Sequence, residues 1–476
     1  MASIKLNYAY SVAYQILLII VPVFTIPYIS RIFGPQNLGV YSYTSSISQY
    51  FVLFAMLGLN NYGVRAIAIV RDDAESLSKT FSEIWLMQLG TSTMALMLYM
   101  CFTLLCGGLY KVYFIIQILF VASAIVDINW LFFGIEKFRL TVIRNSIIKI
   151  LSLAAIFLFI RTKDDLWIYV LIHSVSVFIS ALALWPTALL NVHFVLPGIK
   201  DVLKHLKPNL IMFIPVVAIS VYKYMDKIML GAFSLQQTGY YENAEKILGV
   251  ILGLVTALGT VMLPRISNLI ANKKQDVAAK YLVTSMNFIM FLSIGIASVI
   301  YVASDSFVPI FFGEGFTPCA RVMQILAISA IFSSWANVIR TQFLIPHHKD
   351  RIYVLSVILG ALLNFVGNFL LIKKFGAIGA SISTIMAEAS VAIVQTLASI
   401  RHLPYLKMLV NAIVFTFIGA IIIAFTEIVK YKVNISGIAE LISSVTVATL
   451  TYVGLCLAYN HWCVRILIKV TTKRKK

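Results

Sequence analysis

The sequence predicts an all-α, polytopic integral membrane protein with about fourteen transmembrane helices. Of its 476 residues, 60% are hydrophobic and only 12% are charged, whereas soluble domains carry about 25% charged residues. The mean hydropathy is +0.92, and a water-soluble domain could not bury that much apolar surface. Apolar runs of about 20 residues, enough to cross a bilayer, are centred near residues 18, 48, 95, 123, 153, 178, 219, 254, 292, 333, 362, 388, 418 and 447.

An internal repeat predicts how these spans are grouped. Residues 33–41, FGPQNLGVY, align without a gap with residues 233–241, FSLQQTGYY, at an offset of 200 residues. This match suggests a duplication. We predict a first lobe at residues 1–195, a second at 196–403, and two further spans with a basic cytoplasmic tail at 404–476. Six spans per lobe is an even number, so both lobes should enter the membrane in the same direction, with the substrate pathway between them.

The basic charge is best explained by topology. The net charge is +19, from 38 Lys and Arg against 19 Asp and Glu. With the N-terminus inside, most of these cations fall in inner loops and tails, among them the stretch Glu136–Lys149 and the tail Lys473–Lys476. The positive-inside rule then places both termini in the cytoplasm, and nucleic-acid binding is not expected. The cysteines lack metal-ligand spacing, so we expect no metal and no cofactor; they are Cys101, Cys106, Cys319, Cys456 and Cys463.

The stretch Val221–Tyr241 carries charges at the edge of an apolar run. Lys223, Asp226 and Lys227 are three and four residues apart, which places them on one face of an α-helix. A charge at the centre of a lipid-exposed helix costs about 2.5–3.5 kcal/mol on insertion scales. This face is therefore expected to look into protein or a hydrated cavity.

Span 2 begins with a dense polar stripe. Ser42, Ser45, Ser46 and Gln49 recur at helical spacing, and such a stripe is unfavourable against lipid. It predicts a cavity wall, with a helix–helix interface rich in small residues as the alternative. At the same offset, span 8 begins with a polar segment that includes Lys246.

Other intramembrane or boundary groups leave two interpretations open. Arg31 is either a cavity residue or an anchor at the membrane interface. Asp127 lies near the inner end of span 4, where it is either functional or hydrogen-bonded to a neighbouring span. Glu388 lies near the middle of span 12 and is either a coupling group or half of a structural ion pair. Pro22 and Pro27 are expected to bend or break span 1.

Several motifs together resemble one known family. They are Arg31–Gly34 through Gly39–Tyr41, Asp127–Glu136 with Trp130 and Gly134, Asp226–Gly231 followed by Gly239–Tyr241, Leu263–Arg265, Phe312–Phe316, and Phe375–Ala380 before Glu388. The set is similar to the bacterial polysaccharide repeat-unit flippases, of O-antigen and capsule type. These belong to the multidrug/oligosaccharidyl-lipid/polysaccharide exporter superfamily.

The resemblance implies a two-lobed, V-shaped helical protein with a cationic central cavity. It implies movement of undecaprenyl-pyrophosphate-linked oligosaccharides from the inner to the outer leaflet of the bacterial cytoplasmic membrane, coupled to antiport of a proton or sodium ion. Polysaccharide polymerase machinery is an implied partner. Arg31, Lys223 and Lys227 would attract the pyrophosphate, and the polar face of span 2 would contact sugar hydroxyls. Lys246 would join the substrate site, while Asp127, Asp226 and Glu388 would be coupling groups. The chain departs from the pattern at Pro27, which the offset pairs with Lys227.

Two other functions compete with this one. A multidrug or small-metabolite antiporter of the same superfamily would favour a carboxylate-lined cavity, which Lys223 and Lys227 oppose. A membrane-embedded polymerase or glycosyltransferase would need a sizeable extramembrane segment, and the longest predicted gap is only Ser304–Arg321. The chain also lacks a nucleophile elbow and a Gly-rich phosphate loop. We therefore expect a transporter without catalytic residues.

Overall fold

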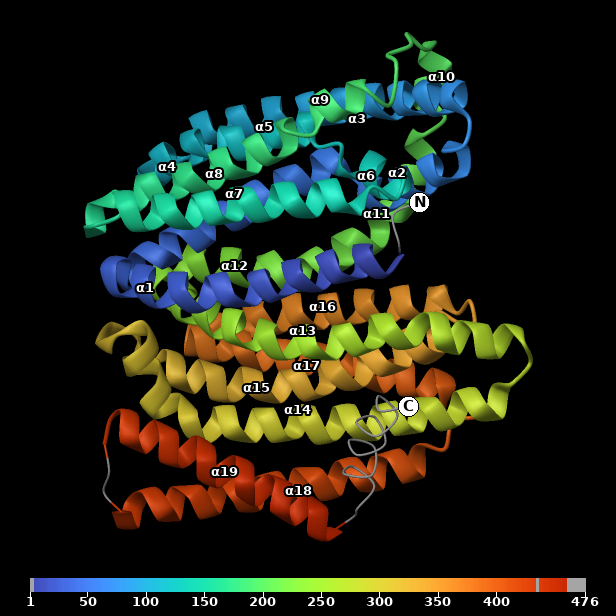
Figure 1. Cartoon of the computed structure of the whole chain (residues 1–476). Helices are drawn as coiled ribbons and strands as arrows, with labels where there is room; N and C mark the ends of the chain where they lie inside the picture. Colours follow the sequence, from blue (N-terminus) through green and yellow to red (C-terminus); the bar gives the residue numbers. More distant parts are fainter. Residues whose placement is uncertain (1–3, 434–435, 460–476) are drawn as a thin grey trace. The chain divides into compact units, whose positions relative to one another are not determined.

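The computed structural model describes residues 4–433 and 436–459, which form helices joined by short connections, with no strand in these ranges. The chain divides into two compact units, residues 1–239 and 240–476 (Figure 1). The helices of the first unit are α1 Ile4–Met56, α2 Leu59–Val70, α3 Ala74–Cys106, α4 Lys111–Ile116, α5 Ile118–Val126, α6 Asn129–Gly134, α7 Phe138–Phe159, α8 Leu166–Leu182, α9 Trp185–Leu189, α10 Ile199–Leu203, α11 Leu206–Ser220 and α12 Asp226–Phe233. The remaining helices are α13 Leu235–Ala271, α14 Gln275–Phe312, α15 Cys319–Ile339, α16 Asp350–Phe375, α17 Ala377–Ser399, α18 Tyr405–Val433 and α19 Ile438–Tyr459.

All fourteen predicted span centres lie inside these helices, and the polytopic all-α prediction is confirmed. Twelve helical segments of the described chain are long and apolar enough to cross a membrane. The first of them, Ile20–Val70, contains the second predicted span and the end of the first, whose centre lies earlier in α1. A shorter apolar helix, Val255–Ala271, overlaps the eighth. Cys463 and the basic tail Lys473–Lys476 lie outside the described residues.

The first two spans are separated at Gly34. Within α1 this is the residue with non-helical dihedrals, φ 70° and ψ 175°, a conformation that glycine adopts without steric cost. The helical dihedrals continue through Pro22 and Pro27, so the first span is not broken at its prolines. The stretch Ser30–Pro35, which carries this glycine and a proline, is where the helix breaks.

The two copies of the repeated motif contact each other reciprocally. A Cβ atom added at Gly39 would lie 1.7 Å from the carbonyl oxygen of Leu235, and one added at Gly239 would lie 2.0 Å from that of Pro35. The offset pairs Pro35 with Leu235 and Gly39 with Gly239, so each copy makes the same contact with the other. This exchange of partners is the pattern of an isologous interface, and only glycine leaves room for it.

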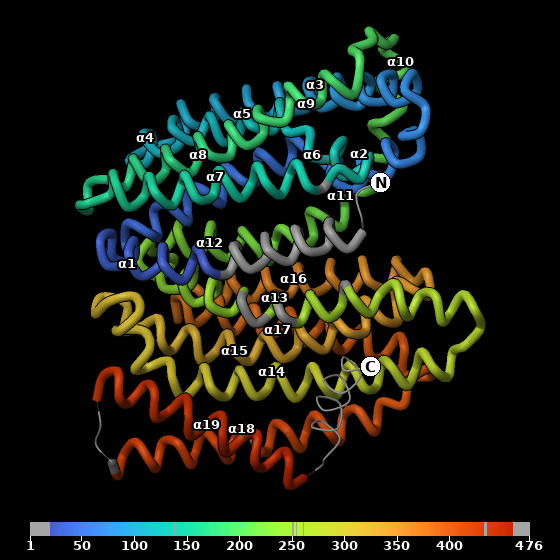
Figure 2. Tube along the Cα trace, viewed as in Figure 1, coloured from blue at the N-terminus to red at the C-terminus, as the bar shows by residue number. Residues whose placement is uncertain are grey.

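The seventh span packs along the second half of α1. It consists of α11, a π-helical turn at Val221–Met225, and α12, and Figure 2 follows this path beside α1. The rings of Phe54 and Phe213 lie 5.5 Å apart, and the backbone of Asn209 approaches Gly58. The first compact unit therefore includes this span, whereas the predicted lobe boundary lies at residue 195. The lobe division from duplication remains a prediction.

Hydrogen bonds and ion pairs hold the segment between spans 6 and 7 against α3. The backbone N–H groups of His193 and Val195 donate to the hydroxyls of Ser78 and Ser82, at 3.1 and 3.0 Å. Directly after Ser82, the buried Glu83 carboxylate lies 2.9 Å from Lys204 Nζ and 2.8 Å from His205 Nε2.

The same network reaches α2, because the other ring nitrogen of His205 bonds to the hydroxyl of Tyr62 at 2.5 Å. Side chains on α2 and α3 thus hold the start of span 7 in place. We call Tyr62, Glu83, Lys204 and His205 the linker clip.

In the second unit α14, α15, α16 and α17 pack together, and α18 and α19 lie along α14 (Figure 1). The last two helices meet α14 at glycines: Gly295 faces the ring of Tyr452, whose hydroxyl donates to the carbonyl of Phe291 at 2.9 Å. The helix α14 continues to Phe312, so the gap predicted from residue 304 is shorter than expected.

Candidate functional site

A polar cavity of about 580 Å³ lies within the first unit. Its walls come from α1, α5, α6, α7 and α8, with one residue from the start of α2. The polar lining residues are Thr25, Asn60, Ser123, Asp127, Asn129, Arg144, Asn145, Lys149, Ser152, Tyr169, His173, Ser176 and Ser180. Most of the positions from α8 are three or four residues apart, as one helical face requires.

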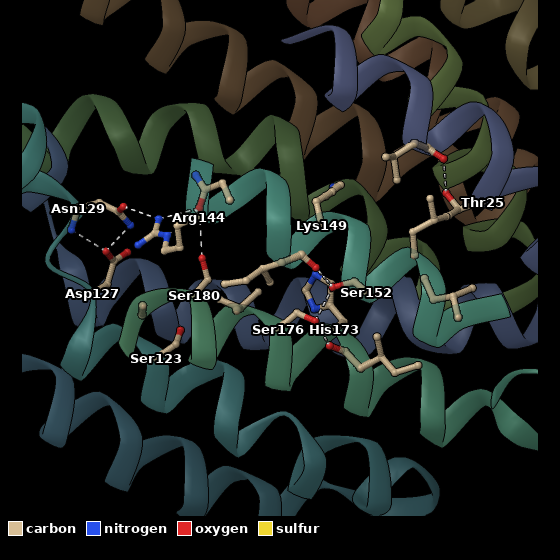
Figure 3. Close-up of a pocket in the computed structure, with 18 of the residues that line it drawn as sticks. Thr25, Ser123, Asp127, Asn129, Arg144, Lys149, Ser152, His173, Ser176 and Ser180 are labelled. Atoms are coloured by element: carbon tan, nitrogen blue, oxygen red, sulfur yellow. Dashed lines mark hydrogen bonds between the residues drawn. The ribbon is translucent and has the colours of Figure 1, made fainter. Parts of the chain in front are cut away.

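One end of the cavity is lined by a hydrogen-bond network around Asp127. This carboxylate accepts from the backbone N–H of Asn129 at 3.0 Å and from its side-chain amide at 2.6 Å. The amide oxygen of Asn129 accepts from Arg144 at 2.9 Å, and Arg144 also donates to Asn145 at 2.6 Å. Asn129 therefore bridges the carboxylate and the guanidinium (Figure 3).

Further along the cavity lie Lys149, Ser152, His173 and Ser176 (Figure 3). The two serine hydroxyls are 2.6 Å apart, and each also donates to a backbone carbonyl of its own helix. His173 stacks edge-on against Tyr41 at 5.8 Å. In the described part of the chain no hydrogen bond or ion pair is found for the Lys149 ammonium.

The position of Lys149 differs from the one predicted. The stretch Glu136–Lys149 is expected from its basic composition to be an inner loop, but α7 begins at Phe138. Lys149 is at the midpoint of the apolar span Arg139–Phe159. Ten residues of helix, about 15 Å, separate it from either end, so its side chain cannot reach the aqueous surface by snorkelling.

The predicted charged face of span 7 is shaped by the π-helical turn. Lys223 and Lys227 both approach the ring of Tyr224, at 5.4 and 5.7 Å, and that ring lies 5.9 Å from the ring of Tyr50. Asp226 is fully buried and Lys227 is 7% exposed, whereas Lys223 is exposed. Each predicted cation of this span therefore has an aromatic neighbour, whose face attracts a positive charge.

The polar side chains of span 2 lie in two different environments. Ser42 and Ser46 are buried, and Ser45 and Gln49 are half-buried. Between them, Ser48 bonds to the hydroxyl of Tyr99 at 2.8 Å and to the amide oxygen of Gln117 at 2.7 Å. The Ser48 side of the helix is thus a helix–helix interface, while Gln49 is next to Tyr50 and its contact with span 7.

The other predicted residues are distributed over both units. Arg31 is exposed and lies just before the break at Gly34. In the second unit, Lys246 forms an ion pair with Glu242 at 3.1 Å. Glu388 is half-buried on α17, with Ser333 and Arg340 as polar neighbours. No group of three metal-ligating side chains is present in the described residues.

The cavity adds Arg144, Lys149 and His173 to the residues named from the sequence. For His173 a sequence signal exists, because Tyr169, His173, Ser176 and Ser180 follow helical spacing within an apolar run. On α7 the corresponding signal is hidden, because the basic residues at its start suggest a loop.

Comparison with known sequences identifies relatives over most of the chain. A family model described as polysaccharide biosynthesis protein matches residues 4–270, more than half of the chain. A protein of Escherichia coli K12 named as an O-antigen transporter is 23% identical over 396 residues, covering 82% of this chain and 95% of that protein. A glycan biosynthesis flippase of Haloferax volcanii is 27% identical over 191 residues, covering 40% of this chain and 39% of that protein.

Comparison with solved structures confirms the fold. A lipid II flippase in an inward closed conformation matches with a TM-score of 0.69 at 15% identity, covering 93% of this chain and 100% of that one. An inward-facing multidrug resistance transporter of the MATE family, in the MOP superfamily, matches with a TM-score of 0.61 at 12% identity. It covers 82% of this chain and 95% of that one. At these identities the likeness concerns the helical architecture.

Proposed function

Since this chain belongs to the polysaccharide biosynthesis protein family, we propose that it is a flippase for lipid-linked oligosaccharides. It moves undecaprenyl-pyrophosphate-linked repeat units from the inner to the outer leaflet for capsule, O-antigen or exopolysaccharide assembly. The observation that carries the proposal is the match to the O-antigen transporter over 82% of this chain and 95% of that protein. The chain is a multi-pass membrane protein, and its location would be the bacterial cytoplasmic membrane, where a polymerase can take over the flipped unit.

The chemical task is to carry a pyrophosphate and a sugar chain past hydrocarbon while the lipid tail remains in the bilayer. Arg31, Lys223, Lys227 and Lys246 would attract the pyrophosphate, because Arg and Lys make strong charge-assisted hydrogen bonds to phosphate oxygens. Ser42, Ser45, Ser46 and Gln49 would contact sugar hydroxyls. The contact between Tyr50 and Tyr224 supports this division, since it joins the polar helix to the cationic one.

Coupling to an ion gradient would use carboxylates inside spans. Intramembrane carboxylates are rare and mark ion or proton pathways, and Asp127, Asp226 and Glu388 are the ones in this proposal. The coupling ion would be a proton or sodium, exchanged for substrate by alternating access.

A clean deletion in the host tests the function. Lipid-linked repeat units should accumulate on the inner leaflet and surface polysaccharide should be lost, with both restored by the intact gene. Normal lipid-linked pools together with increased drug sensitivity would instead indicate a multidrug antiporter. If the deletion instead stops the assembly or polymerisation of the repeat units, and no lipid-linked units accumulate on the inner leaflet, the protein would be an enzyme.

A further inference from the structure

The cavity of the first unit contains a lysine without a compensating anion. Lys149 lines it from the middle of α7, and in the described residues it has no ion-pair partner. The carboxylate of Asp127, at the other end of the cavity, is engaged by Asn129 at 2.6 and 3.0 Å, and Asn129 also contacts Arg144. The Lys149 ammonium is therefore available for an incoming anion.

The rest of the lining suits a sugar ring. Hydroxyls are supplied by Ser123, Ser152, Ser176 and Ser180, and an amide by Asn145. Each of these serine hydroxyls donates its single hydrogen within the protein, so its oxygen faces the cavity as an acceptor for the O–H groups of a sugar. A volume of about 580 Å³ lies within the usual range for small-molecule pockets, about 300–1,000 Å³.

We propose that this cavity binds an acidic sugar of the transported oligosaccharide, with the sugar carboxylate against Lys149 and the ring hydroxyls against the serine and asparagine side chains. The proposal rests on the proposed flippase function and names one feature of its substrate. A single available ammonium matches the single charge of a carboxylate better than the multiple charges of a pyrophosphate. The site would thus select repeat units by their sugar composition, separately from the pyrophosphate common to all of them.

Binding of free oligosaccharides to the purified full-length chain tests the proposal. The protein is placed in nanodiscs of neutral phosphatidylcholine, which removes anionic headgroups. The probes are a trisaccharide with one glucuronic acid, the same trisaccharide with its carboxyl reduced to an alcohol, and inorganic pyrophosphate. The wild type should bind the acidic trisaccharide about ten to a hundred times more tightly than the reduced one, since a hydrogen bond to a charged group contributes that much.

Three variants assign the preference to its residue. Lys149→Gln should lose the preference for the acidic sugar while keeping its affinity for the reduced one. Lys149→Arg should retain the preference, and so should Lys280→Gln, a change of an exposed lysine in the second unit. Retention of the preference by Lys149→Gln would overturn the proposal.

The wild type alone also identifies the ligand class, so the test does not depend on the folding of any one variant. Equal affinity for the two trisaccharides, or displacement of the acidic one by low concentrations of pyrophosphate, would overturn the assignment to a sugar carboxylate. Failure of flipping is measured separately, by the leaflet distribution of lipid-linked units in the deletion host. The binding result and the transport result can therefore fail independently.

Discussion

At the scale of single residues, glycine permits the contact between the two copies of the repeated motif. The backbone carbonyl of Leu235 occupies the space where a Cβ atom of residue 39 would be. Neither partner is the end of a flexible side chain, so the backbones would have to separate. Such overpacking typically costs about 1–3 kcal/mol.

We predict that Gly39→Ala lowers the melting temperature of the purified protein. Gly90→Ala is the matched control, because it lies in α3 with no atom within 4 Å of its added Cβ. That change should raise helix stability by about 0.5–1 kcal/mol. Equal melting temperatures for the two variants would mean that the contact between the motifs is not tight in the membrane.

Glu388 is the residue on which the coupling proposal can be tested most directly. The change Glu388→Gln keeps the size and hydrogen-bonding reach of the side chain but removes its titratable charge. We predict that the variant folds and binds substrate but transports without dependence on an imposed ion gradient in proteoliposomes. A structural carboxylate would behave differently, because removing one partner of a buried ion pair costs about 3–5 kcal/mol. Gradient dependence like that of the wild type would exclude the coupling role.

At the scale of elements, the linker clip holds the segment that joins spans 6 and 7. Glu83 is buried, and its carboxylate faces Lys204, which is half exposed, and His205, which is buried. Its other oxygen has no hydrogen-bond partner in the described part of the chain. The pairing with Lys204 and His205 is therefore its main compensation for burial.

We predict that Glu83→Gln lowers stability by about 1–3 kcal/mol, less than for a fully buried pair because Lys204 is partly hydrated. Asp201→Asn is the control, since Asp201 lies 4.0 Å from the same lysine on the surface and should change stability by less than about 1 kcal/mol. Thermal melting in detergent measures both. A loss that is as large for Asp201→Asn would place the stabilising contact outside the clip.

The comparison of α1 and α7 explains which elements could be predicted from sequence. The turn after Ser30 carries Gly34 and Pro35, strong local signals, and the chain breaks there. The start of α7 carries Arg139 and Arg144, and a polar composition does not distinguish a loop from the end of a helix facing a cavity. Hydropathy therefore locates every span centre, whereas the basic composition of residues 136–149 suggests a loop and misplaces Lys149.

At the scale of the whole molecule, the fold was predictable because lipid leaves few alternatives to apolar helices. The residues of the cavity were harder to predict than the fold. From the sequence, Asp127 belongs to span 4 and Lys149 to a loop, and only packing of α5, α6, α7 and α8 places them in one cavity. Periodicity shows which residues share a helix face but not which faces meet.

The basic connections of the first unit indicate which side of the membrane each end of its helices faces. Its basic connections after α2, α6 and α10 lie at one end of the helices, and α4 with the turn between α7 and α8 lies at the other (Figure 1). Arg71, Lys137 and Lys204 belong to the first group. Since cytoplasmic loops attract Lys and Arg, we predict that this end, like both termini, is cytoplasmic.

Cysteine labelling in intact cells measures this orientation on a background without native cysteines. Glu314→Cys, in the exposed turn after α14, should react with a membrane-impermeant maleimide. Lys273→Cys, in the exposed turn between α13 and α14, should react only after the membrane is permeabilised. A reporter fused after Lys476 should be active in the cytoplasm, because fourteen spans return the chain to the side on which it began. An external C-terminus with an internal Lys273 would require an odd number of crossings after α13, and the pairing of α18 with α19 as two full spans would then be wrong.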